Sequence, residues 1–186
     1  MTTRFTKVGA SIIAATIALG APAFAQNTMV GGAEMFPNRN IVENAVNSAD
    51  HTTLVAAVQA AGLVETLSGP GPFTVFAPTN AAFAALPAGA LDDLLKPENK
   101  EQLVGVLGCH VVEAKAMAAD VVKMIADGNG SAEITTLGNC RLTATTMDGK
   151  VMIGGAGATP VTVTAADLEA GNGVVHVIDG VLLPAS

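Results

Sequence analysis

The chain lacks tryptophan and tyrosine altogether, and its only aromatic residues are six phenylalanines among 186 residues. Tryptophan and tyrosine rings form the platforms on which proteins stack sugars, bases and quaternary amines. A deep aromatic-lined site for a carbohydrate or a nucleotide is therefore not expected. The lack of these rings does not exclude binding of a partner at the protein surface. The core must be built from valine, leucine, isoleucine, alanine and methionine.

Motifs for catalysis and metal binding are also scarce. No His-x-His or Cys-x-x-Cys spacing supplies the three or four ligands of a zinc site. The glycine-rich run at 154–157 lacks the Gly-Lys-Ser/Thr ending of a phosphate-binding loop, and no Gly-x-Ser-x-Gly elbow is present. We therefore expect no metal, no cofactor and no enzymatic activity.

Positive charge is in short supply. Nine Lys and Arg stand against sixteen Asp and Glu, a net charge of −7. An acidic chain repels phosphate backbones and anionic membrane surfaces. Nucleic acid is therefore not an expected partner.

The first 25 residues have the three parts of a cleavable export signal. Arg4 and Lys7 precede an apolar run of about a dozen residues, and Ala23-Phe24-Ala25 ends the segment with small-x-small spacing. The run is shorter than the roughly 20 residues that span a bilayer, and Pro22 interrupts its end; an uncleaved membrane anchor is the alternative. We predict that residues 1–25 are removed as a signal peptide. The mature chain would begin at Gln26 with a net charge of about −9, no integral membrane segment, and a periplasmic or extracellular location.

The predicted export from the cytoplasm affects how the two cysteines, Cys109 and Cys140, are interpreted. Disulfides persist in oxidising compartments, and two cysteines pair within one chain. A bond that closes a loop of about 30 residues stabilises a fold by roughly 3–4 kcal/mol in the chain-entropy model. We predict this disulfide; two unpaired thiols as small core residues are the alternative.

About 160 residues follow the signal, the size of one domain. Residues 26–37 are small and polar and predict a flexible leader, and 38–184 predicts a single domain. Apolar residues at helical spacing predict helices at 41–49, 53–61, 80–86, 91–95, 99–107 and 118–126. Strand-like patterns follow at 134–137, 141–146, 151–153, 161–164, 174–177 and 181–183, with Asp148-Gly149 as a hairpin turn. An early strand at 73–77 must return to pair with them, which predicts an α+β domain with a largely antiparallel sheet.

Cys109 and His110 are adjacent, which suggests a nucleophile and its base. Because 109–112 is β-like, and neighbours on a strand point to opposite faces, no such dyad is expected. His110 and His176 are each expected to be hydrogen-bonded, partly buried structural residues. Surface binding is the alternative for His110. Asp167 and Glu169 are expected on a solvated helix face.

Three segments resemble the signatures of the fasciclin domain family. Residues 74–83 (TVFAPTNAAF) are similar to its first signature, a strand that runs into a capped helix. Residues 107–112 (LGCHVV) lie where the family has a Tyr-His pair, and 172–184 (NGVVHVIDGVLLP) resemble its second signature. The resemblance covers 38–184. It implies a compact α+β domain, an antiparallel strand wedge flanked by short helices, without enzymatic activity.

The resemblance also implies a role in binding. Fasciclin domains occur in secreted and surface-attached proteins and are associated with adhesion and matrix contacts, so the implied partner is a cell-surface or matrix protein or glycan. Cys109 replaces the tyrosine of the family's pair, so a binding mode that uses the tyrosine ring is not implied. We expect binding around His110 and at the exposed part of the first signature, at Thr79 and Asn80.

Two alternatives from other classes remain. One is a binder of small apolar ligands, whose pocket would be lined by Met117, Met124 and neighbouring valine or leucine side chains. The other is a hydrolase, which would need acidic or basic groups that converge in one cleft; the sequence contains no such constellation.

Overall fold

The computed structural model describes residues 29–87, 89–155 and 159–183. The predicted signal peptide, 1–25, lies outside the described residues. The helices are α1 (Ile41–Asn47), α2 (Thr52–Ala61), α3 (Val64–Ser68), α4 (Asn80–Ala84), α5 (Ala90–Leu94), α6 (Lys100–Gly108) and α7 (Ala118–Asp127), with 3-10 turns η1 (Ala49–His51) and η2 (Pro97–Asn99). The strands are β1 (Met29–Val30), β2 (Ala33–Glu34), β3 (Phe73–Pro78), β4 (Val111–Val112), β5 (Ser131–Thr135), β6 (Arg141–Met147), β7 (Lys150–Gly155), β8 (Val161–Ala170) and β9 (Gly173–Ile178).

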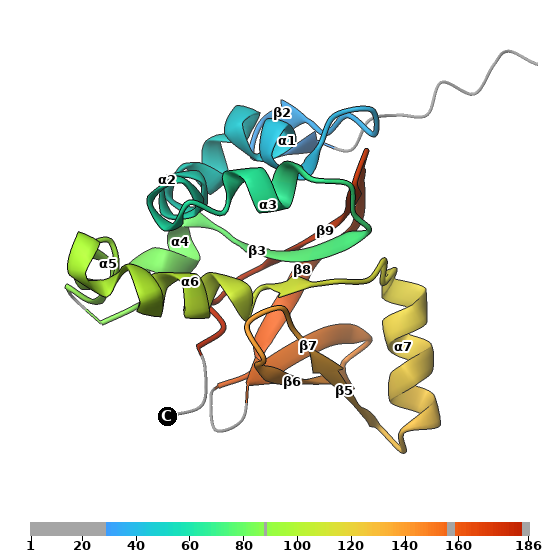
Figure 1. The fold of residues 1–186 in the computed structure, drawn as a ribbon. Coiled ribbons are helices and arrows are strands. Elements are labelled where there is room, and N and C mark those ends of the chain that lie inside the picture. The colour runs from blue at the N-terminus through green and yellow to red at the C-terminus, as the bar shows by residue number, and fades with distance from the viewer. Residues whose placement is uncertain (1–28, 88, 156–158, 184–186) are drawn as a thin grey trace, which may run out of the picture.

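The main sheet has the strand order β4-β3-β9-β8-β7-β6-β5. Its neighbours pair antiparallel except β3 and β9, which run parallel from Phe73↔Gly173 to Pro78↔Ile178. Figure 1 shows α1, α2 and α3 together over β3 and β9, and α7 beside β5, β6 and β7. The α+β class, the largely antiparallel sheet and the return of the early strand are confirmed.

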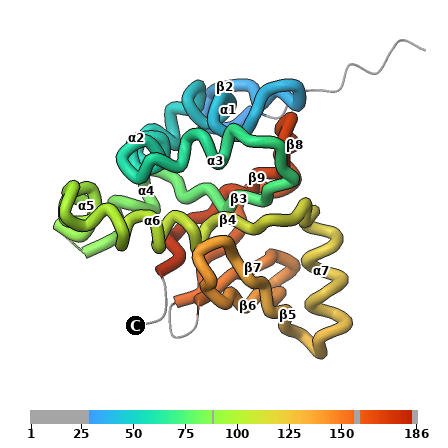
Figure 2. The backbone as a smooth tube through the Cα atoms, in the orientation of Figure 1, coloured from blue at the N-terminus to red at the C-terminus, as the bar shows by residue number. Residues whose placement is uncertain are grey.

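Two hydrophobic clusters lie on opposite sides of β3. Val75 and Ala77 face the first cluster with α1, α2 and α6, whereas Phe76 faces the second cluster with α7 and β5 to β7. Side chains on a strand alternate between faces, so a strand that is buried on both sides reads as a continuous apolar run. The backbone tube in Figure 2 shows β3 and β9 running between the helical part and the β5–β7 part.

Local sequence signals account for several element ends. Asn40 and Glu43 form a capping box at the start of α1, since each side chain accepts a hydrogen bond from the other's backbone N–H, at 2.8 and 2.9 Å. Gly62 ends α2 in the left-handed region at φ 76°. Asp148 and Gly149, at φ 52° and 76°, form the tight turn between β6 and β7. The predicted hairpin is confirmed.

The segment 26–37, predicted to be a flexible leader, contains regular structure in its described part. β1 and β2 pair as a short antiparallel hairpin. Met35 is buried in the first cluster, and the backbone N–H and C=O of Phe36 both bond the side chain of Asn44, at 2.8 and 2.9 Å. Met35 and Phe36 therefore contact the helical part of the fold.

Three segments differ from their predicted secondary structure. The predicted strand at 181–183 is not one, because the Leu182 N–H bonds a histidine ring instead of a neighbouring strand. β8 continues to Ala170, so Asp167 and Glu169 lie on a strand and not on a helix face. The helix α3 was not predicted, since five residues are too few to show a helical period.

Candidate functional site

His110 is 1% exposed and lies inside the fold. His110 follows the end of α6 and precedes β4. The prediction that Cys109 and His110 lie in a strand is therefore wrong. The ring donates from Nδ1 to the carbonyl of Val106 at 2.8 Å and accepts at Nε2 from the N–H of Leu182 at 2.9 Å. Burial lowers the pKa of His110 to about 4, so the ring is neutral at physiological pH. A direct surface contact through His110, which we expected as one possibility, conflicts with this burial.

The backbone of the same residue ties further elements together. The carbonyl of His110 accepts the N–H of Phe76 at 2.8 Å, next to the β3–β4 pairing. His110 thus links α6, β3 and the segment after β9 through one side chain and one carbonyl. These contacts support a structural role for His110, which is one of the two predicted alternatives.

Cys109 and Cys140 are joined in the predicted disulfide, with 5.2 Å between their Cα atoms. Beside the bond, the N–H of Gly138 donates to the carbonyl of Gly108 at 3.0 Å, and the N–H of Leu137 donates to Val111 at 2.7 Å. Together these contacts fasten the β5–β6 turn to the end of α6. A bonded sulfur is not a nucleophile, so Cys109 and His110 form no catalytic dyad.

Thr79 and Asn80 act as helix caps. The Thr79 hydroxyl accepts the Ala82 N–H at 3.3 Å, which caps α4 as the sequence predicts. Asn80 accepts at Oδ1 from the Thr53 N–H at 3.0 Å and donates from Nδ2 to the Ala49 carbonyl at 2.8 Å. It therefore supplies a cap to the first turn of α2, where His51 makes no such side-chain bond. Binding at Thr79 and Asn80 stays a prediction, and both side chains already have partners within the fold.

His176 is buried against Phe76, with the ring centroids 5.7 Å apart. Its Nε2 donates to the Ala116 carbonyl at 2.8 Å, and its Nδ1 accepts the N–H of Asp167 at 3.3 Å. The Asp167 carboxylate in turn accepts the Ala118 N–H at 2.6 Å, at the start of α7. Burial lowers the pKa of His176, so this histidine is also neutral and structural.

Two small cavities lie beneath the helices. One, of about 30 Å³, is lined from α1, α2 and α3, and the other, of about 20 Å³, lies between α1 and the sheet. Each has room for about one water molecule, whereas ligand pockets occupy roughly 300–1,000 Å³. Met124 is 41% exposed on the outside of α7, and the cavity of about 10 Å³ under that helix is lined by neither Met117 nor Met124. This part of the structure does not support the methionine-lined pocket.

An open groove between α1 and α3 is much larger, at about 590 Å³. We call it the α1–α3 groove; its lining residues are Arg39, Asn40, Val42, Glu43, Val46, Asn47, Val64 and Ser68. Val46 is 55% exposed, a high value for a valine on a short helix. Sequence patterns alone did not predict this groove. The only signal in the sequence is the apolar pair Val42 and Val46, which are four residues apart and so share one face of a helix.

Within residues 29–87, 89–155 and 159–183, no group of three or more His, Cys, Asp and Glu is placed to hold a metal ion. Within the same ranges, no helix combines the length and apolar character needed to cross a membrane.

Comparison with known proteins identifies the class. The model of the Fasciclin domain matches residues 49–184, and the chain belongs to the fasciclin domain family. The chain is 46% identical to Protein sll1483 of Synechocystis sp. (strain ATCC 27184 / PCC 6803 / Kazusa), over 96% of this chain and 98% of that protein. It is 35% identical to Immunogenic protein MPB70 of Mycobacterium bovis, over 75% of this chain and 66% of that protein.

Two further similar proteins are matched over only part of their length. Transforming growth factor-beta-induced protein ig-h3 of Sus scrofa is 37% identical over 70% of this chain and 17% of that protein. The solved FAS1 domain pair of the insect cell adhesion molecule Fasciclin I superposes with a TM-score of 0.69 at 18% identity, over 78% of this chain and 51% of the pair. The FAS1 fold is thereby shown.

Proposed function

We propose that the protein is exported and binds a partner at the cell surface or in the extracellular matrix, without catalysing a reaction. The observation that carries the proposal is that a single fasciclin domain, matched over 49–184, makes up most of the chain. The family is one of adhesion-type domains, and one solved structure with the same fold comes from a cell adhesion molecule.

The state of the reactive side chains supports a binding role. Cys109 is bonded to Cys140. His51, His110 and His176 are all buried, and burial lowers the pKa of each. A general base needs a pKa near the working pH and an opening to substrate. The three rings are buried, and the pKa of His110, at about 4, also lies well below physiological pH.

The disulfide supports export. Disulfides form and persist outside the cytoplasm, and the first 25 residues carry the charged start, apolar middle and small-residue exit of a signal. These two features support the proposal of a periplasmic or outer-surface location. The partner would be a protein or a glycan of the cell surface or matrix.

The test begins with the processed protein. Expression of the full-length gene, fractionation and N-terminal sequencing should recover a protein outside the cytoplasm that begins at Gln26, with no thiol that reacts before reduction. The recovered protein is then immobilised and exposed to cell-surface extract. An unrelated exported protein of similar acidity is the control, and retention that does not exceed this control would contradict the adhesion role.

A further inference from the structure

We propose that the partner docks in the α1–α3 groove and presents a carboxylate beside an apolar side chain, as an acidic and apolar peptide segment does. This inference rests on the proposed function, because it names the surface and the partner chemistry of the same binding role. It is carried by the arrangement of one cation, three valines and a cavity.

The groove has an apolar floor between two helices. Val42 and Val46 lie four residues apart on α1 and share one face of it, and Val64 approaches from α3. Val46 is more than half exposed, and Val42 and Val64 are partly exposed. An apolar side chain laid between the two helices would cover all three and remove their exposed apolar surface from water, which is favourable.

The floor borders on unfilled space. Val42 and Val64 line both the groove and the cavity of about 30 Å³ beneath it. The inner walls of that cavity are apolar, with Val58 and Leu67 among them. Because this cavity holds about one water molecule, it leaves Val42 and Val64 room for a small inward adjustment when an apolar side chain packs on them.

Arg39 supplies the charge at one end of the groove. Its guanidinium carbon lies 4.5 Å from the centre of the Phe36 ring, and no carboxylate among the described residues forms an ion pair with it. Stacking uses the face of the guanidinium and leaves its N–H edge available for a carboxylate. The ring also restrains a long side chain, so less conformational entropy is lost on binding.

One acidic residue, Glu43, also lines the groove. One of its carboxylate oxygens accepts the Asn40 N–H at 2.9 Å, within the capping box, which holds this charge at the first turn of α1. Arg39 lies in the bend before α1 and lines the groove together with Val42, so the cation and the apolar floor border the same groove. Partner segments with a carboxylate at one end and an apolar residue next to it match this arrangement.

The groove suits a peptide better than a glycan. Sugars are held by open aromatic faces, and the lining residues include no aromatic ring. The nearby Phe36 ring is covered by the Arg39 guanidinium. Glycan binding in the groove is thus an outcome of the test and not the proposal.

The experiment titrates the isotope-labelled exported protein with three capped hexapeptides and follows its amide resonances. The first peptide has two central leucines flanked by glutamates, the second replaces the glutamates with lysines, and the third replaces the leucines with serines. We expect saturable shifts at the amides of Val42, Val46 and Val64 with the first peptide. Affinity should fall at least threefold with each of the other two.

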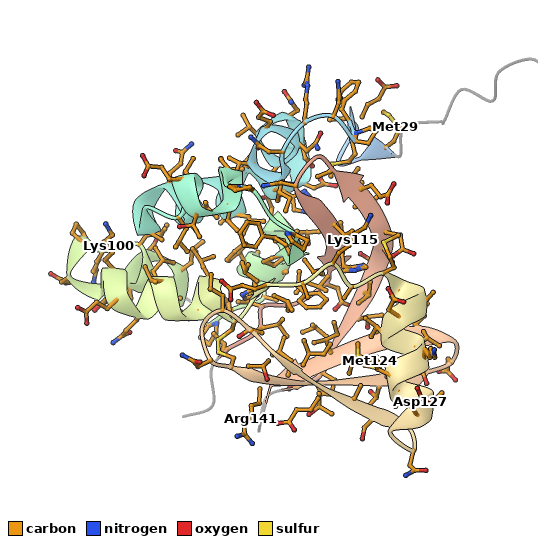
Figure 3. The ribbon with its side chains drawn as sticks, turned by 45° about the vertical axis from the view of Figure 1, so that its right-hand side comes forward. Met29, Lys100, Lys115, Met124, Asp127 and Arg141 are labelled. Atoms are coloured by element: carbon orange, nitrogen blue, oxygen red, sulfur yellow. A yellow bond between two sulfur atoms is a disulfide. The ribbon has the colours of Figure 1, made fainter. Side chains whose placement is uncertain are left out.

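Matched variants separate the site from general effects. Arg39→Gln and Val46→Ser should each weaken binding of the first peptide at least threefold. The controls are Arg141→Gln and Val122→Ser, which change the same residue types at exposed positions outside the groove; Figure 3 shows Arg141 at the opposite end of the molecule from Met29 and the N-terminal elements. These controls should bind like the unmodified protein.

The outcomes distinguish the groove from the wider function. Shifts outside the groove, equal affinity for all three peptides, or binding that survives both groove variants would overturn the docking proposal. If cell-surface extract is retained equally by the groove variants and the unmodified protein, adhesion stands and the groove is wrong. If the leucine–glutamate peptide binds as expected but extract is not retained above the control, the groove stands and the adhesion role fails. A shift pattern produced by soluble oligosaccharides and not by peptides would also overturn the peptide assignment.

Discussion

Leu182 donates its backbone N–H to Nε2 of His110 at 2.9 Å, which joins two residues 72 positions apart. Because Nε2 is the acceptor, the ring proton is on Nδ1, where it is donated to Val106. A second proton on this ring would have to displace the Leu182 N–H from Nε2. The two residues therefore hold the segment after β9 only while the histidine is neutral.

This geometry predicts acid sensitivity. The pKa of His110 is about 4 in the folded protein, below the value of 6.5 that applies to the unfolded chain. The unfolded state binds the extra proton between these two values, so the free energy of unfolding should fall as pH falls from about 6.5 toward 4. The loss from His110 alone should be about 3 kcal/mol, and His51 and His176 act in the same direction because burial lowers both their pKa values.

Urea unfolding across pH 5.5 to 7.5 measures the upper part of this fall in stability, above the range where most carboxylates titrate. The variant His110→Gln removes one titrating group and should flatten the slope, although the variant is less stable at neutral pH. A slope that is unchanged in the variant would show that His110 is not the group responsible.

The Cys109–Cys140 bond predicts a second loss of stability. The bond closes a separation of 31 residues, and its removal should lower the free energy of unfolding by roughly 3–4 kcal/mol. Chemical unfolding of the Cys109→Ser, Cys140→Ser double variant measures the loss. A dithiol reductant should destabilise the natural protein by a similar amount and leave the double variant unaffected; equal sensitivity of both proteins would contradict the assignment.

The contact between Gly108 and Gly138 predicts a steric penalty. A Cβ on Gly138 would lie 2.8 Å from the carbonyl carbon of Gly108 and 2.9 Å from the backbone nitrogen of Cys109, closer than real Cβ contacts allow. Backbone atoms cannot swing aside as a side chain does, so Gly138→Ala should cost about 1–3 kcal/mol. Thermal unfolding of Gly138→Ala and the unmodified protein at matched concentration measures this loss of stability.

The control for this substitution is Gly105→Ala. Gly105 lies in α6 and its Cβ would meet nothing within 4 Å. Alanine is the better helix former, so this change should stabilise the protein by about 0.5–1 kcal/mol. If Gly138→Ala and Gly105→Ala shifted the unfolding temperature in the same direction, the close approach at Gly138 would not be the cause of the stability change in Gly138→Ala.

Much of the fold could be predicted because its signals are local. A capping box at Asn40, a left-handed Gly62 and an Asp148-Gly149 turn each act within a few residues, and all three mark real element ends. The predicted export signal and the cysteine count likewise led to the disulfide that the structure contains. These inferences need no knowledge of distant contacts.

The site could not be predicted in the same way, because its geometry depends on contacts between distant segments. The run 181–183 is apolar and β-like, but its backbone meets a histidine ring 72 positions away. His110 matched a family motif, yet only the packing of α6 and β3 around it shows that it is buried. The α1–α3 groove combines Arg39 from a turn, Val42 from one helix and Val64 from a helix too short to show its period.

Asn80 provides the last prediction, because its side chain caps a helix 27 positions earlier. Its Oδ1 accepts from the Thr53 N–H and its Nδ2 donates to Ala49, so Asn80→Ala leaves the first turn of α2 without a cap. Loss of a cap costs about 0.5–2 kcal/mol, and we expect a value near the upper end because two backbone groups lose their partner. Urea unfolding checks the value, with Asn38→Ala as control, since Asn38 is exposed in a turn and should change stability by less than about 0.5 kcal/mol.

If Asn80→Ala weakened retention of surface extract while the folded fraction stayed complete, Asn80 would be a contact residue as well as a cap. Unchanged retention would assign it to the scaffold alone.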